Sequence, residues 1–138
     1  MTSQTILDRV RSLVTAAPFY AKESATPFDF SRVPMQDEDD AVRVTSRTVR
    51  VLGGLSYTEE VYDDVEIEVL RRVAGDTGDT ARGLWTTAQS LTSRLVRDAV
   101  EGDYAVPDEG RQAEVDVPAG ASYAVLRLTV PVSYMQSL

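Results

Sequence analysis

The stretch VYDDVEIEVLRRV, residues 61–73, alternates apolar and charged side chains with the period of a β-strand. The apolar residues at odd positions are Val61, Val65, Ile67, Val69 and Val73. Even positions carry Asp64, Glu66, Glu68 and Arg72. Because successive side chains of a strand point to opposite faces, one face is expected in a core and the other outside it. The function of the protein depends on what the outward acids do.

The segment before this strand predicts its pairing partner. Residues 41–52, AVRVTSRTVRVL, are rich in β-branched residues, and their apolar phase changes near Ser46, which is typical of a bulge or a bend. Gly53 and Gly54 follow and permit a turn. The two strands are therefore expected to form a long antiparallel hairpin with a flexible tip.

Two other segments carry apolar residues at helical spacing. Residues 3–17 predict a short amphipathic helix that Pro18 ends, and residues from Asp76 or Asp79, as N-cap, to Val100 predict a longer one. Trp85 lies on the apolar side of this second helix and is expected in the core. The following residues, 101–111, predict an acidic surface loop.

A second hairpin is predicted at the end of the chain. QAEVDV (112–117) and SYAVLRLTVPVSYM (122–135) alternate in the same way around a turn at Pro118–Gly120. Pro131 lies on the polar phase, and its missing N–H indicates a sheet edge or the end of a strand. The order α-β-β-α-β-β predicts an α+β fold with an antiparallel sheet of about four strands packed on one or two helices.

The 138 residues are expected to form one domain with an extended arm at about 18–40. The arm follows neither the helical nor the strand period, and it contains Phe28 and Phe30. Disordered linkers are poor in aromatic residues, so the arm is expected to pack against a surface, for example that of another copy.

Composition excludes several kinds of chemistry. The chain has no cysteine and no histidine, so disulfides, cysteine nucleophiles, serine–histidine hydrolysis and histidine-based metal sites are ruled out. The formal charge of −8 disfavours binding to a phosphate backbone. There is no apolar run of membrane-spanning length and no signal-like start, so we expect a soluble intracellular protein without membrane contact.

The acids Asp63, Asp64, Glu66 and Glu68 are the candidate functional residues of the first stretch. Glu66 and Glu68 share one face at ~7 Å, which could suit a glycosidase pair or a divalent cation. No third ligand motif or aromatic platform accompanies them, so a solvated sheet face is the favoured interpretation. A third interpretation is a charged wall that faces a channel.

The arginines of the preceding strand, Arg43, Arg47 and Arg50, form a basic stripe. They are expected to pair with nearby acids or with a neighbouring subunit instead of binding nucleic acid. Since no catalytic constellation, metal site or cofactor site is predicted, we expect a structural or binding protein and not an enzyme.

A resemblance to a known family rests on four segments: ILDRVRSLV, VTSRTVRV with VYDDVEIEVL, LWTTAQSLTSRLVRDAV and YAVLRLTVPVSY. In this order the chain resembles the tail-terminator (tail-completion or minor tail) proteins of long-tailed bacteriophages. The resemblance covers most of the chain and rests on element order and pattern. It implies a ring, a hexamer in this family, that caps the tail tube and joins the tail to the head connector. It also implies a virion location after assembly in the host cytoplasm, no enzymatic activity and no cofactor.

Under this hypothesis DNA passes through the hole of the ring without specific binding. Asp63, Asp64, Glu66 and Glu68, or the loop at 101–109, would line or flank the hole, where like charge repels DNA. The residues expected to supply subunit or partner contacts are Phe28, Phe30, Arg43, Arg47, Arg50, Gly53 and Gly54. The alternatives are another neck or connector component of a phage, a small-molecule-binding or regulatory domain, and a hydrolase that uses carboxylates alone.

Overall fold

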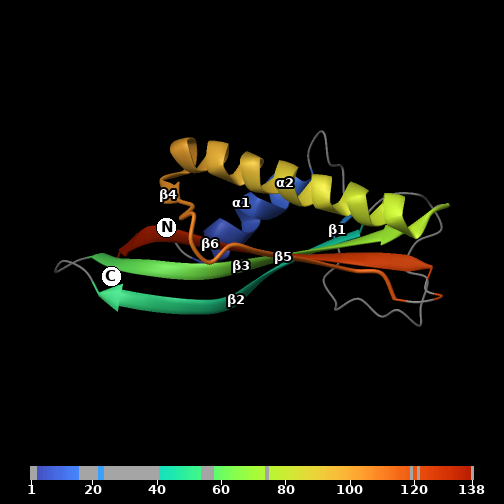
Figure 1. Cartoon of the computed structure of the whole chain (residues 1–138). Coiled ribbons are helices and arrows are strands. Elements are labelled where there is room, and N and C mark those ends of the chain that lie inside the picture. Colours follow the sequence, from blue (N-terminus) through green and yellow to red (C-terminus); the bar gives the residue numbers. More distant parts are fainter. Residues whose placement is uncertain are drawn as a thin grey trace.

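The computed structural model describes residues 3–15, 22–23, 41–53, 58–73, 75–118, 120 and 122–137. Within these ranges, two helices lie on one face of a six-stranded, mostly antiparallel sheet (Figure 1). The elements are α1 (Ser3–Thr15), β1 (Lys22–Glu23), β2 (Ala41–Gly53), β3 (Thr58–Arg72), α2 (Thr77–Gly102), β4 (Tyr104–Ala105), β5 (Gln112–Asp116) and β6 (Tyr123–Ser137). The predicted α+β class and order are confirmed, and the two-residue strands β1 and β4 are additions to them.

The sheet joins the two predicted hairpins through their longest strands. β2 pairs with β3 in antiparallel register from Ala41 opposite Leu70 to Gly53 opposite Glu60. β3 then pairs with β6 over its full length of 15 residues. A register shift between Ser46 and Thr48 confirms the predicted change of phase. Gly54, at the predicted tip, is outside the described residues.

The free side of β6 is shared by two shorter strands. β5 pairs with Val125–Thr129 and β4 pairs with Ser133–Tyr134. Pro131 stands between these two stretches, where its missing N–H leaves no ladder hydrogen bond unmade. The predicted sheet edge at Pro131 is thus local, while the alternative of a strand end is wrong because β6 continues to Ser137.

The core lies between the sheet and the two helices, and strand alternation accounts for its composition. Its buried members include Ile6, Val10 and Val14 of α1, Leu84, Leu91 and Leu95 of α2, Val65, Ile67 and Val69 of β3, and Leu126, Leu128 and Val130 of β6. Each such side chain contributes roughly 1.5–3 kcal/mol when fully buried, and the ordering of the chain offsets most of the sum. On the opposite face, Leu70, Tyr123 and Val125 form a second small buried cluster.

Helix α2 begins and ends at identifiable caps. The side chain of Asp76 accepts a hydrogen bond from the Gly78 amide at 2.8 Å, which confirms the first of the two predicted N-caps. At the other end Asp103 has a left-handed φ of 56°. The predicted surface loop at 101–111 is partly wrong, because α2 continues to Gly102 and the buried Tyr104 joins the sheet in β4.

Trp85 does not lie in the core as predicted. Its side chain is 46% exposed, whereas the adjacent Leu84 is fully buried. One residue turns an α-helix by ~100°, so Trp85 points sideways from a helix whose buried face is centred on Leu84. Val96 and Val100 on α2 are also exposed. No helix in the described ranges is long and apolar enough to span a bilayer.

Two residues of the predicted arm are part of the sheet. Lys22 and Glu23 form β1 and pair in parallel with Ala41 and Val42 at the start of β2. Phe28 and Phe30 are outside the described residues, so their predicted contact role stays a prediction.

Candidate functional site

The four acids that were predicted to face a channel do not share one face of the sheet. Asp64, Glu66 and Glu68 point away from the helices, whereas Asp63 lies on the helix face with Val61 and Val65. Asp63 is fully buried, opposite Val132 of β6. The prediction of a common acidic wall is therefore wrong for Asp63, because its odd position in β3 sends it toward the core.

Glu68 lies on the outer face, but it is neutralised there. Its side chain is only 11% exposed, and Oε1 accepts a hydrogen bond from Nη1 of Arg43 at 2.9 Å. Nε of Arg127 lies 3.7 Å from the other carboxylate oxygen. The predicted pairing of Arg43 with a nearby acid is confirmed, while the side chains of Arg47 and Arg50 are outside the described part of the structure.

These ion pairs belong to a row of alternating charge that crosses four strands. The register places Arg43 of β2 opposite Glu68 of β3, Glu68 opposite Arg127 of β6, and Arg127 opposite Glu114 of β5. Cross-strand pairs of opposite charge contribute roughly 0.2–1 kcal/mol each. The row ends in a carboxylate at the open edge of β5.

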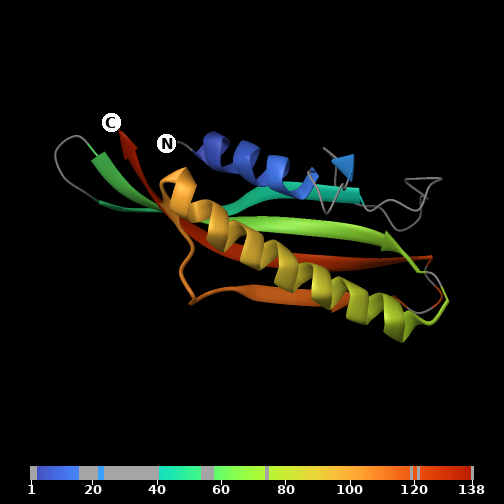
Figure 2. The same ribbon diagram turned by 90° about the horizontal axis from the view of Figure 1, so that it is seen from above.

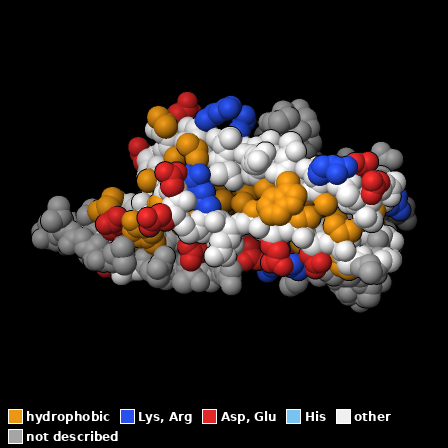
Figure 3. Space-filling model, in the orientation of Figure 1, with side chains coloured by type: hydrophobic (Ala, Val, Ile, Leu, Met, Phe, Trp, Pro, Cys, Tyr) orange, Lys and Arg blue, Asp and Glu red, His pale blue; other side chains and the backbone are white. Residues whose placement is uncertain are grey.

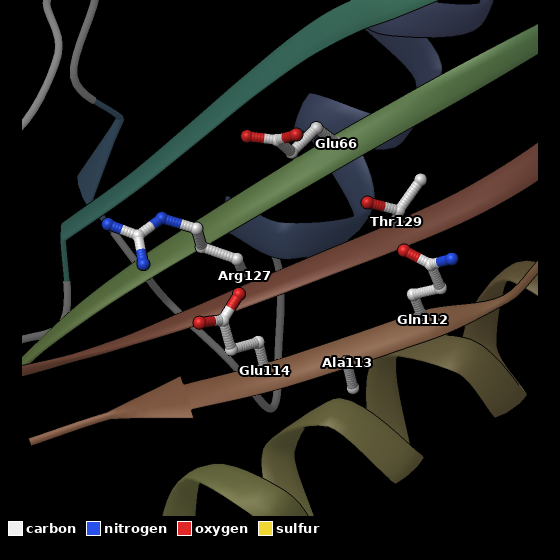
Figure 4. Close-up of a pocket in the computed structure, with 6 residues that line it drawn as sticks. All are labelled: Glu66, Gln112, Ala113, Glu114, Arg127 and Thr129. Atoms are coloured by element: carbon white, nitrogen blue, oxygen red, sulfur yellow. The ribbon is translucent and has the colours of Figure 1, made fainter.

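A polar pocket of about 380 Å³ opens on the same face (Figure 4). Its lining residues are Glu66, Gln112, Ala113, Glu114, Arg127 and Thr129. Small-molecule sites of this size are mostly apolar, and here only Ala113 is apolar. Arg127 comes from β6, the strand between those that carry Glu66 and Glu114 (Figure 4).

No cluster of three or more acids suited to a metal ion occurs within the ranges that the structure describes. Glu66 and Glu68 share one face as predicted, but the arginines that neutralise Glu68 occupy the place where a cation would bind. Glu68 is only 11% exposed, so the predicted solvated sheet face is wrong for this residue.

A part-buried hydrogen-bonded triad, not foreseen from the sequence, holds the two helices and β4 together. Both carboxylate oxygens of Asp98 accept hydrogen bonds from Arg9, at 2.6 and 3.0 Å. The hydroxyl of Tyr104 donates to Asp98 at 2.7 Å. The hydrogen bond from Arg9 lowers the pKa of Asp98, and burial raises the pKa of Tyr104. Gly102 makes room for the triad, since an added Cβ would lie 2.5 Å from the Tyr104 ring.

An apolar strip lies between α2 and the open edge of β5. Trp85 is 46% and Val96 41% exposed on α2. Below them Val115 and Val117 are only partly buried against the core. Figure 3 shows apolar side chains gathered on the middle of this face, with acidic side chains beneath them. An exposed apolar strip next to an unpaired strand edge is typical of a protein interface.

At one end the sheet extends beyond both helices (Figures 1 and 2). We call this part the ribbon end; it consists of 51–53 of β2, 58–60 of β3 and 135–137 of β6. Val51 and Met135 are about half exposed there, at 53% and 49%. Gly53 lies in this part, in register with Glu60 and next to a second register shift.

The described residues therefore offer exposed surfaces that a partner could cover. A comparison with protein families found no family model that matches the chain, and a comparison with curated proteins found no matching sequence.

Proposed function

We propose that this protein is a structural subunit of a long-tailed phage, which assembles into a ring, caps the tail tube and joins it to the head connector. The ribbon end is the observation that carries the proposal. Here β2, β3 and β6 continue past the helices that cover them elsewhere (Figure 2). Val51 on the helix side of the sheet and Met135 on the opposite side are about half exposed here, and a docking partner that covers both faces of this end would bury them.

The element order supports the same proposal. A short helix, a long hairpin, one amphipathic helix and a final long strand follow one another as the resemblance implies. Because fold alone does not establish function, the proposal depends on the surfaces and not on this order.

Fewer acids of β3 than expected are available to line the hole of the proposed ring. Asp63 is buried and Glu68 is neutralised, which leaves Asp64 and Glu66 on the outer face of β3. The exposed acids of residues 101–109 are Glu101, Asp103, Asp108 and Glu109. Together with the net charge of −8, they would repel DNA that passes through the ring.

Negative-stain electron microscopy tests the proposal directly. Purified protein would be imaged over a range of concentrations, alone and with the tail tube protein from the same genome. We expect closed rings with a central hole, and a ring at one end of each tube. Absence of rings under both conditions would refute the proposal. Rings that bind the portal side and ignore tubes would favour the alternative of another neck component.

A further inference from the structure

The two long edges of the sheet carry opposite charge. β2 contains Arg43, Arg47 and Arg50 and no acid, which gives +3 from the sequence, and Arg43 among them is paired with Glu68. The segment 101–118, which contains β4 and β5, has six acids and one arginine and therefore −5 (1 − 6). In the sheet β2 lies toward one edge and β5 at the other, with β3 and β6 between them. Surfaces of opposite charge on one molecule favour contact between two copies of it.

Strand direction is compatible with such a contact. β2 is antiparallel to β3, β3 to β6, and β6 to β5. Four strands that alternate in this way leave β5 running opposite to β2. A second copy in the same orientation would therefore bring its β2 alongside β5 as an antiparallel neighbour, the usual geometry for strand addition.

The position on β2 where this contact fits is limited by the chain itself. β1 already pairs with Ala41 and Val42, and Nη2 of Arg11 donates a hydrogen bond to the carbonyl of Val44 at 3.2 Å. The backbone of 46–53 continues beyond both of these contacts as strand. This part of β2 is longer than the five residues of β5 and includes Arg47 and Arg50.

The helices present matching apolar flanks at the same two edges. Thr87 of α2 accepts a hydrogen bond from Arg71 on β3, and Trp85 lies ~200° round the helix from it, toward β5. On α1, Arg9 contacts Asp98 of α2, and Leu7 lies ~200° round from Arg9, on the flank away from α2. A second copy whose β2 adds to β5 would thus bring its Leu7 toward Trp85.

We infer that two copies of this chain associate head to tail through these edges. The β2 residues 46–53 of one copy, a stretch that contains Arg47 and Arg50, lie against β5 of the next, which carries Glu114 and Asp116, and Leu7 packs toward the strip at Trp85. This inference rests on the proposed function, because it names the contact between neighbours in the ring. The contact is short and charged, so association is expected to depend on protein concentration and to weaken as salt screens the charges.

Charge reversal with rescue tests this contact. Sedimentation velocity would compare the wild type with Asp116→Arg, with Arg50→Glu and with the double variant. Each single reversal should weaken association about tenfold or more, and the double variant should restore it. Asp79→Arg is the control for Asp116→Arg, since it changes the net charge by the same amount and sign but lies on the outward side of α2. Thermal melts of each variant establish that it is folded.

A second readout uses the single tryptophan of the chain. Trp85→Ala should weaken association about tenfold while leaving the melting temperature nearly unchanged, because the side chain is already half exposed. In the wild type, tryptophan emission should shift to the blue as concentration rises.

The outcomes separate this inference from the proposed function. Oligomers of wild-type protein that none of these variants affects would overturn the edge-to-edge contact and leave the ring standing. A wild type that stays monomeric at every concentration and salt would also overturn it, and tube images would then decide the proposed function. Oligomers that are sensitive to the variants but never cap a tube would confirm the contact and refute the function.

Discussion

Asp98→Ala is expected to destabilise the protein more than any other single carboxylate removal from α2. Asp98 accepts two hydrogen bonds from Arg9 and one from Tyr104, and its side chain is only 13% exposed. Arg9 is 37% exposed, so its ion pair is partly screened and adds little. The larger loss comes from Tyr104, because the substitution removes the carboxylate that accepts a hydrogen bond from its buried hydroxyl. The hydroxyl then keeps only the Leu95 carbonyl, at 3.4 Å, as a hydrogen-bond partner.

The expected cost is about 2–3 kcal/mol, because hydrogen bonds to charged groups contribute roughly 1.5–3 kcal/mol and the exposed arginine roughly 0–1. Unfolding entropy of about 2.1 cal/mol/K per residue converts this to a fall in Tm of about 7–10 °C for 138 residues. Denaturation by urea and by heat, both followed by circular dichroism, would measure the two quantities.

Asp8→Ala serves as the matched control. Asp8 also pairs with an arginine, Arg11 at 3.2 Å, but its side chain is 62% exposed. Its removal is expected to cost no more than about 1 kcal/mol. Equal effects of the two substitutions would refute the reasoning, because burial and the Tyr104 hydrogen bond are then without consequence.

The pH dependence of stability also tests the contribution of Asp98. The folded-state pKa of Asp98 is lowered by the hydrogen bond from Arg9, so its contribution is complete above the unfolded pKa of about 4. As pH falls through the lower folded pKa, the carboxylate is protonated and the contribution is lost. The stability difference between wild type and Asp98→Ala should therefore be constant near neutrality and shrink below about pH 4.

Three further predictions concern the same network and the outer face. Burial raises the pKa of Tyr104, so its hydroxyl should resist ionisation above pH 10 until the protein unfolds. Tyr104→Phe should remove a late-ionising tyrosine from an ultraviolet titration and lessen the alkaline loss of stability. Gly102→Ala should destabilise by roughly 1–3 kcal/mol in urea denaturation, because its Cβ would overlap the Tyr104 ring, while Gly83→Ala, facing only the flexible end of Arg71, should be neutral or stabilising. Glu68→Ala should cost more than Glu114→Ala by thermal melting, since it leaves the part-buried Arg43 and Arg127 without their common partner.

The sequence predicted the elements well where one period dominated. Alternation in β3 and β6 was strong enough to indicate both strands and their inner faces, and the shift near Ser46 indicated the irregularity in β2. Two-residue strands such as β1 and β4 have no period of their own. They form because the tertiary fold brings these residues next to the edge of a longer strand, and the local sequence does not indicate this.

The candidate site was less predictable, because side-chain roles depended on neighbours from distant strands. Glu68 and Glu66 look alike in the sequence, yet the register places Arg43 of β2 opposite Glu68 and Thr45 opposite Glu66. The odd position of Asp63 in β3 indicates that its side chain faces the core. It was nevertheless grouped with the neighbouring acids, as if it faced outward. Trp85 was wrongly placed in the core because the apolar face of the helix, ~100° wide, was taken to include one residue too many.

The distribution of charge also limits how open edges can pair. Unpaired strand edges invite association with any other edge, and proteins restrict this with charged side chains. Two β5 edges would place the acids Glu114 and Asp116 of both copies together, and two β2 edges would do the same with the arginines of that strand. Symmetric pairing of either edge with itself is therefore disfavoured, and only the head-to-tail contact joins opposite charges. A head-to-tail contact either closes into a ring or continues as a filament, so the angle between neighbours decides which assembly forms.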